Sequence, residues 1–161
     1  MEKHPSAKLL MVGKGSLENH LRSYAGRYGF LNLVTDFIDK EAKVYHYAPA
    51  DLCVFPSLYE PFGIVALEAA AMGKAAVVGA SGVSGLREIV ENPSADRPTG
   101  VHINPREPGD IAWGINLALE DLDRLKAWGN NSRERALKKF TWRHAAEITL
   151  DFYREAATSR R

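Results

Sequence analysis

Apolar residues along this chain fall into two kinds of segment, which correspond to the two common secondary structures. Short apolar runs, each about the length of one strand, recur along its first two thirds. The predicted strands cover residues 8–12, 31–38, 51–57, 75–80 and 100–104. Other segments have apolar residues at the three-to-four-residue spacing of helices. The predicted helices cover residues 16–28, 40–47, 63–72, 86–90, 108–120, 122–139 and 142–157.

Strands and helices follow each other in turn, which is typical of α/β proteins with a parallel sheet and helices on both faces. We expect one domain over residues 1–161, with Ser16 capping the first helix. Binding sites in such sheets lie where the strands end, at their carboxyl edge. The loops at 13–15, 37–39, 59–63 and 81–85 meet this condition.

Two carboxylates flank an apolar segment after the third predicted strand. Glu60 and Glu68 enclose seven residues, none of which has a polar side chain. The helix that holds Glu68 is apolar on every other side, so we expect it to be buried. Burial of a carboxylate is costly unless the group pairs with a charge or accepts hydrogen bonds. A polar group must therefore meet Glu68, and a ligand rich in hydroxyl groups is a candidate.

The start of this helix is a candidate anion site. The N–H groups at a helix N-terminus bind anions, phosphates above all, and Gly63 would let a ligand approach the backbone. Helical side chains lean toward the N-terminus, so Glu68 can reach a group attached to that phosphate, while Glu60 reaches it from the loop. The residues alone also allow Glu60 to be a solvated loop residue and Glu68 to pair with a buried Arg or Lys.

The segment from Glu60 to Glu68, with Pro-Phe-Gly after its first Glu, resembles the donor-site motif of retaining nucleotide-sugar glycosyltransferases. These are the GT-B-fold enzymes of group 1, which include glycogen synthases. Residues 50–57, 73–78 and 84–90 are similar to neighbouring segments of the same family. The sequence departs from the family pattern at Ala75, where Pro is usual, and at Ser84, where Gly is usual. The resemblance covers nearly the whole chain and implies a Rossmann-like domain, the C-terminal half of a GT-B fold.

The resemblance also implies a role for each matching residue. The second Glu of the motif binds the ribose hydroxyls, which corresponds to Glu68, and the first Glu meets a hydroxyl of the transferred sugar. Glu60 is thus the catalytic candidate. The resemblance implies that the loop at 13–15 lets the donor approach and that the loop at 37–39 packs against the base. The loops at 59–63 and 81–85 meet the diphosphate or the sugar. These further donor-binding candidates are Gly13, Gly15, Phe37, Ile38, Phe62, Gly63, Ile64, Ser84, Gly85 and Leu86.

The family resemblance extends to parts that we expect to lie outside this chain. The family's Arg and Lys, which neutralise the leaving diphosphate, precede the strand at 8–12, as does the N-terminal acceptor domain. We expect the chain alone to bind a nucleotide sugar without turnover and to need that acceptor domain, in cis or in trans. A cleft face left unpaired is a candidate surface for a homodimer. The resemblance implies that anomeric configuration is retained, with the departing phosphate acting as the base.

Composition excludes some other classes of protein. The 21 Lys and Arg residues balance 20 Asp and Glu residues, so the basic footprint of a nucleic-acid-binding protein is absent. No apolar run reaches the roughly 20 residues that a membrane span needs, and we expect a cytoplasmic protein. We expect no metal site and no cofactor besides the donor substrate, an ADP-, UDP- or GDP-sugar. Cys53 is predicted to be a small core residue.

Three functions agree with these features. We favour the donor-binding half of a retaining hexosyltransferase that transfers glucose to a glucan or another glycan, since residues 110–115 resemble glycogen-synthase-like members. The alternative is a non-catalytic nucleotide-sugar-binding subunit of a two-chain transferase, which a co-purifying partner would support. The third is a glycosidase with Glu60 and Glu68 as its carboxylate pair. Hydrolysis of an aryl glycoside that is lost in Glu60→Gln would support that function.

Overall fold

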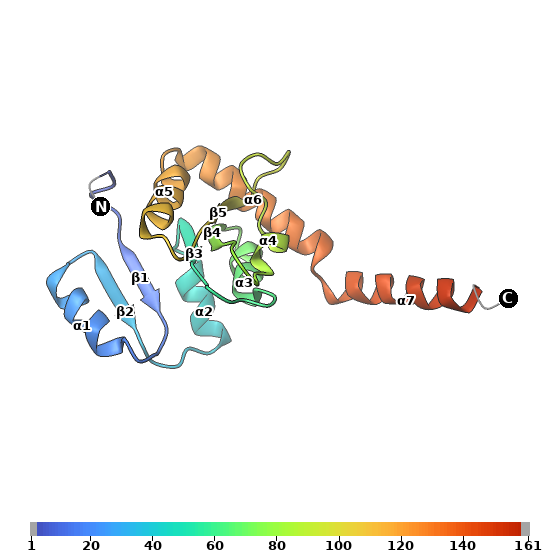
Figure 1. Cartoon of the computed structure of the whole chain (residues 1–161), viewed down its shortest axis with the longest axis horizontal. Coiled ribbons are helices and arrows are strands. Elements are labelled where there is room, and N and C mark those ends of the chain that lie inside the picture. The colour runs from blue at the N-terminus through green and yellow to red at the C-terminus, as the bar shows by residue number, and fades with distance from the viewer. Residues whose placement is uncertain (1–2, 159–161) are drawn as a thin grey trace. The chain divides into compact units, whose positions relative to one another are not determined.

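The computed structural model describes residues 3–158, in which strands and helices alternate as predicted (Figure 1). The strands are β1 (Leu9–Val12), β2 (Leu31–Val34), β3 (Leu52–Phe55), β4 (Ala75–Gly79) and β5 (Gly100–Ile103). The helices are α1 (Glu18–Arg27), α2 (Lys40–Tyr47), α3 (Ile64–Ala71), α4 (Leu86–Ile89), α5 (Pro108–Leu119), α6 (Leu122–Lys139) and α7 (Trp142–Thr158). The predicted α/β class is confirmed.

The chain forms two compact units, Met1–Tyr45 and His46–Arg161. In the first, β1 and β2 pair in parallel, with Leu9 opposite Leu31, and α1 packs against β2. In the second, β3, β4 and β5 form a parallel sheet in that order. The sequence indicated one parallel sheet, whereas the described strands form two hydrogen-bonded sheets. The single nucleotide-sugar-binding domain expected over residues 1–161 stays a prediction.

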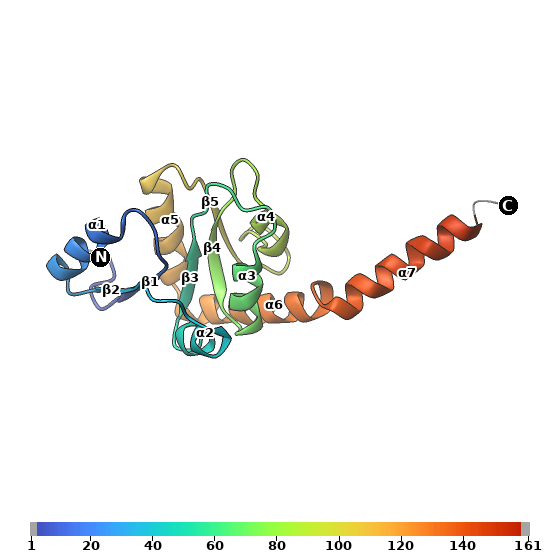
Figure 2. The ribbon, with the colours of Figure 1, turned by 90° about the horizontal axis from the view of Figure 1, so that it is seen from below.

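The sheet of the second unit is covered by helices on both faces, as expected (Figure 2). Because side chains alternate along a strand, neighbouring residues of β4 enter opposite cores. Val78 belongs to the core beneath α3 and α4, and Val77 belongs to the core beneath α5 and α6. Every residue of β4 is buried. The strand therefore gives a rigid base to the loop that follows it.

Two predictions in the first unit were wrong. Ser16 does not cap α1, because the helix begins at Glu18 with Leu17 at the N-cap position and without a side-chain cap. The second strand ends at Val34 rather than at residue 38. Thr35 is buried and its hydroxyl accepts a hydrogen bond from Arg22, whereas the Phe37 side chain is 95% exposed. The apolar run therefore continues past the last residue that pairs in the sheet.

Helix α3 was expected to be buried, and in the structure this burial is confined to one side of the helix. Ala66, Ala69 and Ala70 are buried against the sheet and α6, and their small side chains let these elements approach closely. Ile64, in the first turn, remains 62% exposed. The helix therefore presents an accessible N-terminus at the edge of the sheet.

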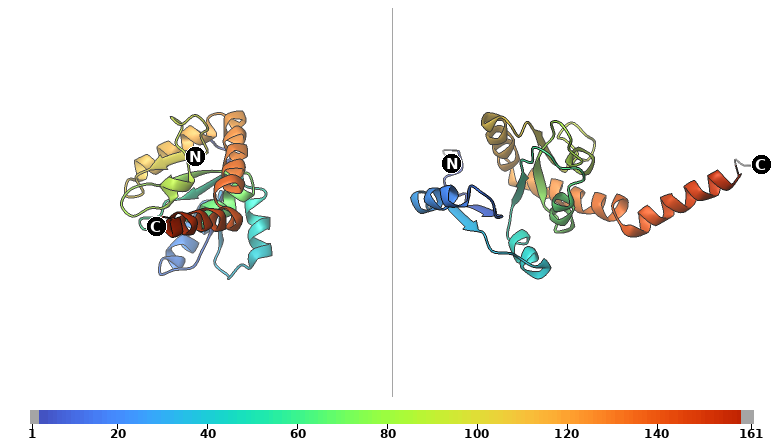
Figure 3. Two further views of the ribbon diagram at one scale, coloured as in Figure 1. Left: turned by 90° about the vertical axis from the view of Figure 1, so that its right-hand side faces the viewer. Right: turned by 60° about the horizontal axis from the view of Figure 1, so that its bottom comes forward.

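Helix α7 follows α6 and extends beyond the sheet of the second unit (Figures 1 and 3). None of its residues is buried, and the Trp142 side chain is 92% exposed. Within the described residues, no helix is both long enough and apolar enough to cross a membrane.

Candidate functional site

The Glu60 loop and the loop that contains Ser84 are joined by backbone hydrogen bonds where β3 and β4 end. Glu60 accepts the Gly85 N–H at 2.8 Å and donates its own N–H to Val83 O at 3.1 Å. Glu60 and Ser84 thus form a parallel β-bridge. The Glu60 backbone is therefore fixed at the carboxyl edge of the sheet, where the sequence placed it.

The Glu60 side chain turns back to the start of α3. Its Oε1 accepts the Gly63 N–H at 3.1 Å. A carboxylate at a helix N-terminus is favoured by the helix dipole and by the N–H groups that lack a partner within the helix. The half-buried carboxylate is thus held in one place beside the first turn of α3. It also occupies one of the N–H groups expected to face a donor.

Two glycines are required for this arrangement. Gly63 has a φ of 99°, in the left-handed region that L-residues rarely adopt, and an added Cβ would lie 2.6 Å from Leu86 Cδ2. At Gly85 an added Cβ would lie 2.6 Å from the carbonyl oxygens of Pro61 and Phe62. Any larger residue there would separate the two loops. Both glycines are therefore sites of close packing as well as donor-binding candidates.

The other candidates in these loops divide into accessible and buried groups. Phe62 and Ile64 have exposed side chains beside the start of α3, while Leu86 is fully buried in the core. Ser84 is also buried, and its hydroxyl donates to the Gly79 carbonyl at 2.6 Å. In this structure the Ser84 hydroxyl supports the fold, so any contact with a donor would use the backbone.

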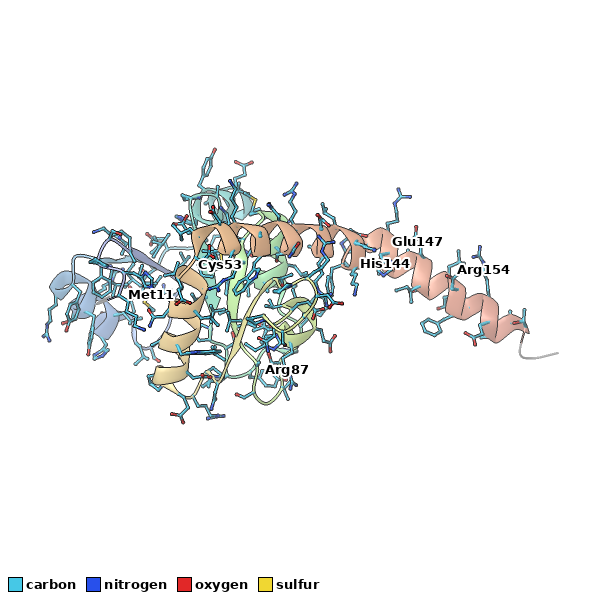
Figure 4. The ribbon with its side chains drawn as sticks, turned by 90° about the horizontal axis from the view of Figure 1, so that it is seen from above. Met11, Cys53, Arg87, His144, Glu147 and Arg154 are labelled. Atoms are coloured by element: carbon cyan, nitrogen blue, oxygen red, sulfur yellow. The ribbon has the colours of Figure 1, made fainter. Side chains whose placement is uncertain are left out.

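Arg87, on α4, donates hydrogen bonds to the backbone of the loop that contains Ser84. Its guanidinium donates through Nη2 to the Gly82 carbonyl at 3.1 Å and through Nε to the Ser84 carbonyl at 3.4 Å; Figure 4 labels this side chain. Because these contacts involve backbone carbonyls, they hold the shape of the loop rather than neutralise a carboxylate.

Glu68 lies on α3 and meets a polar group of the chain itself. The Tyr47 hydroxyl lies 3.2 Å from Glu68 Oε2 and 3.5 Å from the Val65 carbonyl oxygen. Burial, followed by the nearby Glu68 carboxylate, raises the pKa of Tyr47 above its ordinary value. The sequence predicted that a polar group must meet Glu68, and a tyrosine hydroxyl supplies such a contact. The half-buried Glu68 carboxylate is thus oriented from the side of α2.

Tyr47 is the residue of this site that the sequence did not reveal. It ends α2, 21 positions before Glu68, so no local spacing connects the two residues. Its place at the end of the predicted helix over residues 40–47 was the only signal, and that signal is shared by many core tyrosines.

The remaining candidates lie in the first unit. Gly13 follows β1 and donates its N–H to Val34 O at 3.0 Å, and Gly15 accepts the Glu18 N–H. A pocket of about 210 Å³ lies beside these glycines, between the end of β1 and the start of α1. Phe37 is exposed and Ile38 half-buried. The structure thus brings Gly13 and Gly15 to one pocket, while Phe37 and Ile38 follow β2.

Cys53 lies in the core on β3, as predicted (Figure 4). Burial raises the pKa of its thiol to about 11, so the neutral form is strongly favoured at physiological pH. Because the thiolate is the reactive form, this cysteine serves packing rather than nucleophilic chemistry.

One metal-ligand spacing was overlooked in the sequence, the Asp-x-Asp triplet Asp121-Leu122-Asp123. Asp121 caps α6, where its Oδ1 accepts the Arg124 N–H at 2.9 Å. The capping hydrogen bond accounts for Asp121 without a metal. Among residues 3–158, no group of three or more His, Cys, Asp or Glu side chains is arranged to hold a metal ion.

Comparison with known proteins identifies relatives over most of the chain. An uncharacterized glycosyltransferase of Methanocaldococcus jannaschii is 35% identical over 97% of this chain, and the glycogen synthase of Mycobacterium tuberculosis is 33% identical over 98%. The solved sucrose-phosphate synthase of Thermosynechococcus elongatus matches 96% of this chain with a TM-score of 0.75 and 30% identity. It shares the fold, although this chain covers only 40% of that structure.

The chain spans 39% and 37% of the length of the first two relatives. The family model for glycosyl transferases group 1 matches residues 1–135. These matches include both carboxylates and both loops described above. The chain therefore belongs to the glycosyl transferases group 1 family.

Proposed function

We propose that this chain is the donor-binding part of a retaining hexosyltransferase that uses a nucleotide-diphosphate sugar. The observation that carries the proposal is the pair of carboxylates at the start of α3, with Glu60 bound to the Gly63 N–H and Glu68 contacted by Tyr47. Membership in the glycosyltransferase family supports a sugar donor. Carboxylates accept hydrogen bonds from the hydroxyl groups of a ligand, and the N–H groups of a helix N-terminus bind its diphosphate.

Each part of the donor has a counterpart in this arrangement. Glu68 accepts hydrogen bonds from the ribose hydroxyls, and Glu60 accepts one from a hydroxyl of the transferred sugar. The diphosphate lies against the first turn of α3 and the backbone of Gly85, where helix N–H groups and the dipole favour negative charge. The family resemblance assigns Gly13 and Gly15 to the approach of the donor and the backbone of Phe37 and Ile38 to its base.

The chemistry follows from the charge that develops when the sugar leaves. The departing diphosphate acts as the base toward the acceptor hydroxyl, so no side-chain nucleophile is required and the configuration is retained. Helix N–H groups at the start of α3 stabilise the phosphate charge, and groups of this kind contribute factors of roughly 10²–10³ to rates. The family's Arg and Lys, together with a domain that binds the acceptor in cis or in trans, complete the site.

The substrate class is a glucosyl donor with a glucan or another glycan as acceptor. Two relatives support this choice by the products that their names give. One is the glycogen synthase of M. tuberculosis, named for a glucan, and the other is the sucrose-phosphate synthase of T. elongatus, named for a sugar phosphate. ADP, UDP and GDP all remain candidate nucleotides, because contacts between the base and the backbone have no side-chain signature. We propose that the donor binds without a divalent cation, so EDTA leaves its affinity unchanged.

Calorimetric titration with ADP-, UDP- and GDP-glucose tests this function. One of the three binds the wild-type chain, and Glu68→Ala weakens that affinity roughly 10-fold or more, because hydrogen bonds to a charged group contribute about 1.5–3 kcal/mol. Glu88→Ala, which removes an exposed carboxylate from α4, is the matched control and leaves the affinity unchanged. Equal binding by wild type and Glu68→Ala would contradict the assignment of Glu68.

A parallel assay separates transfer from hydrolysis. The chain should not release the aryl group from nitrophenyl glycosides, because Glu60 is bound to the start of α3 rather than placed as a glycosidase acid. Hydrolysis that disappears in Glu60→Gln would replace the transferase proposal with a glycosidase.

A further inference from the structure

Contacts other than the hydrogen bond to Glu68 hold Tyr47 in place. Its backbone carbonyl accepts the Ala50 N–H at 3.2 Å, and Lys74 Nζ donates to the neighbouring Ala48 carbonyl at 2.7 Å. The Tyr47 ring packs against the core that contains Cys53 and Ala69. Both the backbone and the ring are therefore held, and the hydroxyl has a defined position.

The hydroxyl of Tyr47 has one proton and two acceptors within reach. Glu68 Oε2 is at 3.2 Å and the Val65 carbonyl oxygen is at 3.5 Å. An ionised carboxylate is the stronger acceptor, and it is also the nearer one, so the proton is donated to Glu68. The contact therefore orients a charged group from a rigid, neutral donor.

A neutral donor suits a carboxylate that must still bind a ligand. A Glu side chain loses rotamer entropy when it is ordered, and an existing hydrogen bond removes part of that loss from the binding step. The ordered carboxylate then accepts hydrogen bonds from the hydroxyl groups of a ligand.

We propose that Tyr47 is a positioning residue, whose hydroxyl holds the Glu68 carboxylate in the orientation that receives the ribose hydroxyls of the donor nucleotide. The inference rests on the proposed function, since it assumes that Glu68 binds ribose. Tyr47 thus contributes to the discrimination between ribose and deoxyribose through Glu68, without contacting the donor itself.

The test compares ribonucleotides with their deoxy counterparts. Calorimetry gives the affinities of ADP, UDP and GDP and of the 2′-deoxy and 3′-deoxy form of each, and the ratio of ribo to deoxy affinity is the readout. The variants are Tyr47→Phe, which removes only the hydroxyl, Glu68→Ala, and Tyr45→Phe as the control. Tyr45 lies on the same helix, and its side chain is 77% exposed.

The expected results differ among the variants. Wild type and Tyr45→Phe prefer the ribonucleotide equally, and Glu68→Ala loses the preference. Tyr47→Phe lowers the preference roughly 2- to 10-fold, the range for one hydrogen bond, through weaker binding of the ribonucleotide alone.

Other outcomes separate this inference from the function on which it rests. A Tyr47→Phe variant that keeps the wild-type ratio would overturn the inference, and so would one that weakens ribo and deoxy nucleotides equally, since that marks a purely structural role. In both cases, loss of the preference in Glu68→Ala would leave the proposed function standing. No preference in the wild type, or a full preference in Glu68→Ala, would overturn the ribose role of Glu68 itself.

Discussion

Gly85 lies where the two loops of the candidate site come into backbone contact. Its N–H donates to the Glu60 carbonyl, and the space for a Cβ is already filled by the carbonyl oxygens of Pro61 and Phe62. Backbone atoms have less freedom to move aside than the end of a side chain. The shape of the site at this residue thus depends on the absence of a single carbon atom.

Gly85→Ala should therefore destabilise the fold by roughly 1–3 kcal/mol, the usual range for overpacking. The control is Gly109→Ala in α5, where an added Cβ meets no atom within 4 Å. That change should leave stability unaltered or raise it by up to about 1 kcal/mol, because alanine is the better helix former. Chemical denaturation measures both, and equal stabilities for the two variants would contradict the close packing of the loops.

Tyr47 gives the site a pH dependence. Its pKa is raised from the ordinary 10.0, first by burial and then by the Glu68 carboxylate. The folded state favours the neutral phenol, so this contribution to stability is fully present below about pH 10 and is lost as the pH rises above that value.

Ultraviolet titration of tyrosinate should show one group that ionises at higher pH than the others. Tyr47→Phe should remove that group, and Glu68→Gln should lower the pKa of Tyr47 without returning it to 10.0, because burial remains. If Tyr47→Phe instead removed a tyrosine of ordinary pKa, the contact between Tyr47 and Glu68 would not exist in solution.

At the scale of elements, one arginine of α6 connects that helix to the end of α4. Arg135 donates to the carbonyls of Glu88 and Ile89 and pairs with Glu91 at 2.6 Å. Carbonyls at a helix C-terminus lack partners within the helix, so a guanidinium there satisfies groups that would otherwise lose hydrogen bonds. The side chain of Arg135 is 17% exposed, which reduces the screening of this ion pair by water.

Arg135→Ala should cost about 2–4 kcal/mol of stability, because it leaves a carboxylate and two carbonyls without their donor. Arg154→Ala is the matched control on α7, where Arg154 pairs with Asp151 and both side chains are largely exposed. Exposed pairs contribute about 0–1 kcal/mol, so the control should change little. Similar losses in the two variants, measured by thermal unfolding, would argue against a special role for Arg135.

The order of elements and the place of the site were predictable because each has a local signal. An apolar run that leads through Pro61 and Gly63 into an Ala-rich helix specifies a strand, a turn and a helix, and Glu60 and Glu68 lie at fixed places in it. The end of β2 was not predictable, since Phe37 and Ile38 prolong the apolar run beyond the pairing in the sheet.

Contacts between segments distant in the sequence could not be predicted from local sequence patterns either. The hydrogen bond from Tyr47 to Glu68 and the bridge between Glu60 and Ser84 depend on tertiary packing. Sequence spacing could predict that Glu68 needs a polar partner, because a buried carboxylate is costly. It could not identify that partner.

At the scale of the whole molecule, the second unit divides into a packed body and an exposed helix. The cores on the two faces of its sheet contain the buried residues of α3, α4, α5 and α6, whereas α7 has none. Stability should follow buried apolar area, so it should reside in the body.

Removal of α7 after Thr141 should therefore change the unfolding free energy by no more than about 0.5 kcal/mol, the usual range for surface changes. Denaturant unfolding followed by Trp128 fluorescence, with Trp113 and Trp142 changed to Phe in the full-length reference and Trp113 in the truncated chain, measures the body of this unit. Trp128 is buried in the core beneath α5 and α6. A large loss of stability on truncation would show that α7 packs against the body in solution.

The most direct test of the central claim is an amide-NMR titration of the chain with ADP-, UDP- and GDP-glucose. We predict that one of the three shifts the amides of Gly63, Ile64 and Gly85, and that Glu68→Ala needs roughly 10-fold more of it, or more, for the same shifts while its spectrum remains that of a folded protein. If none of the three nucleotide sugars shifts those amides at millimolar concentration, or if Glu68→Ala responds like the wild type, then the start of α3 is not the donor site.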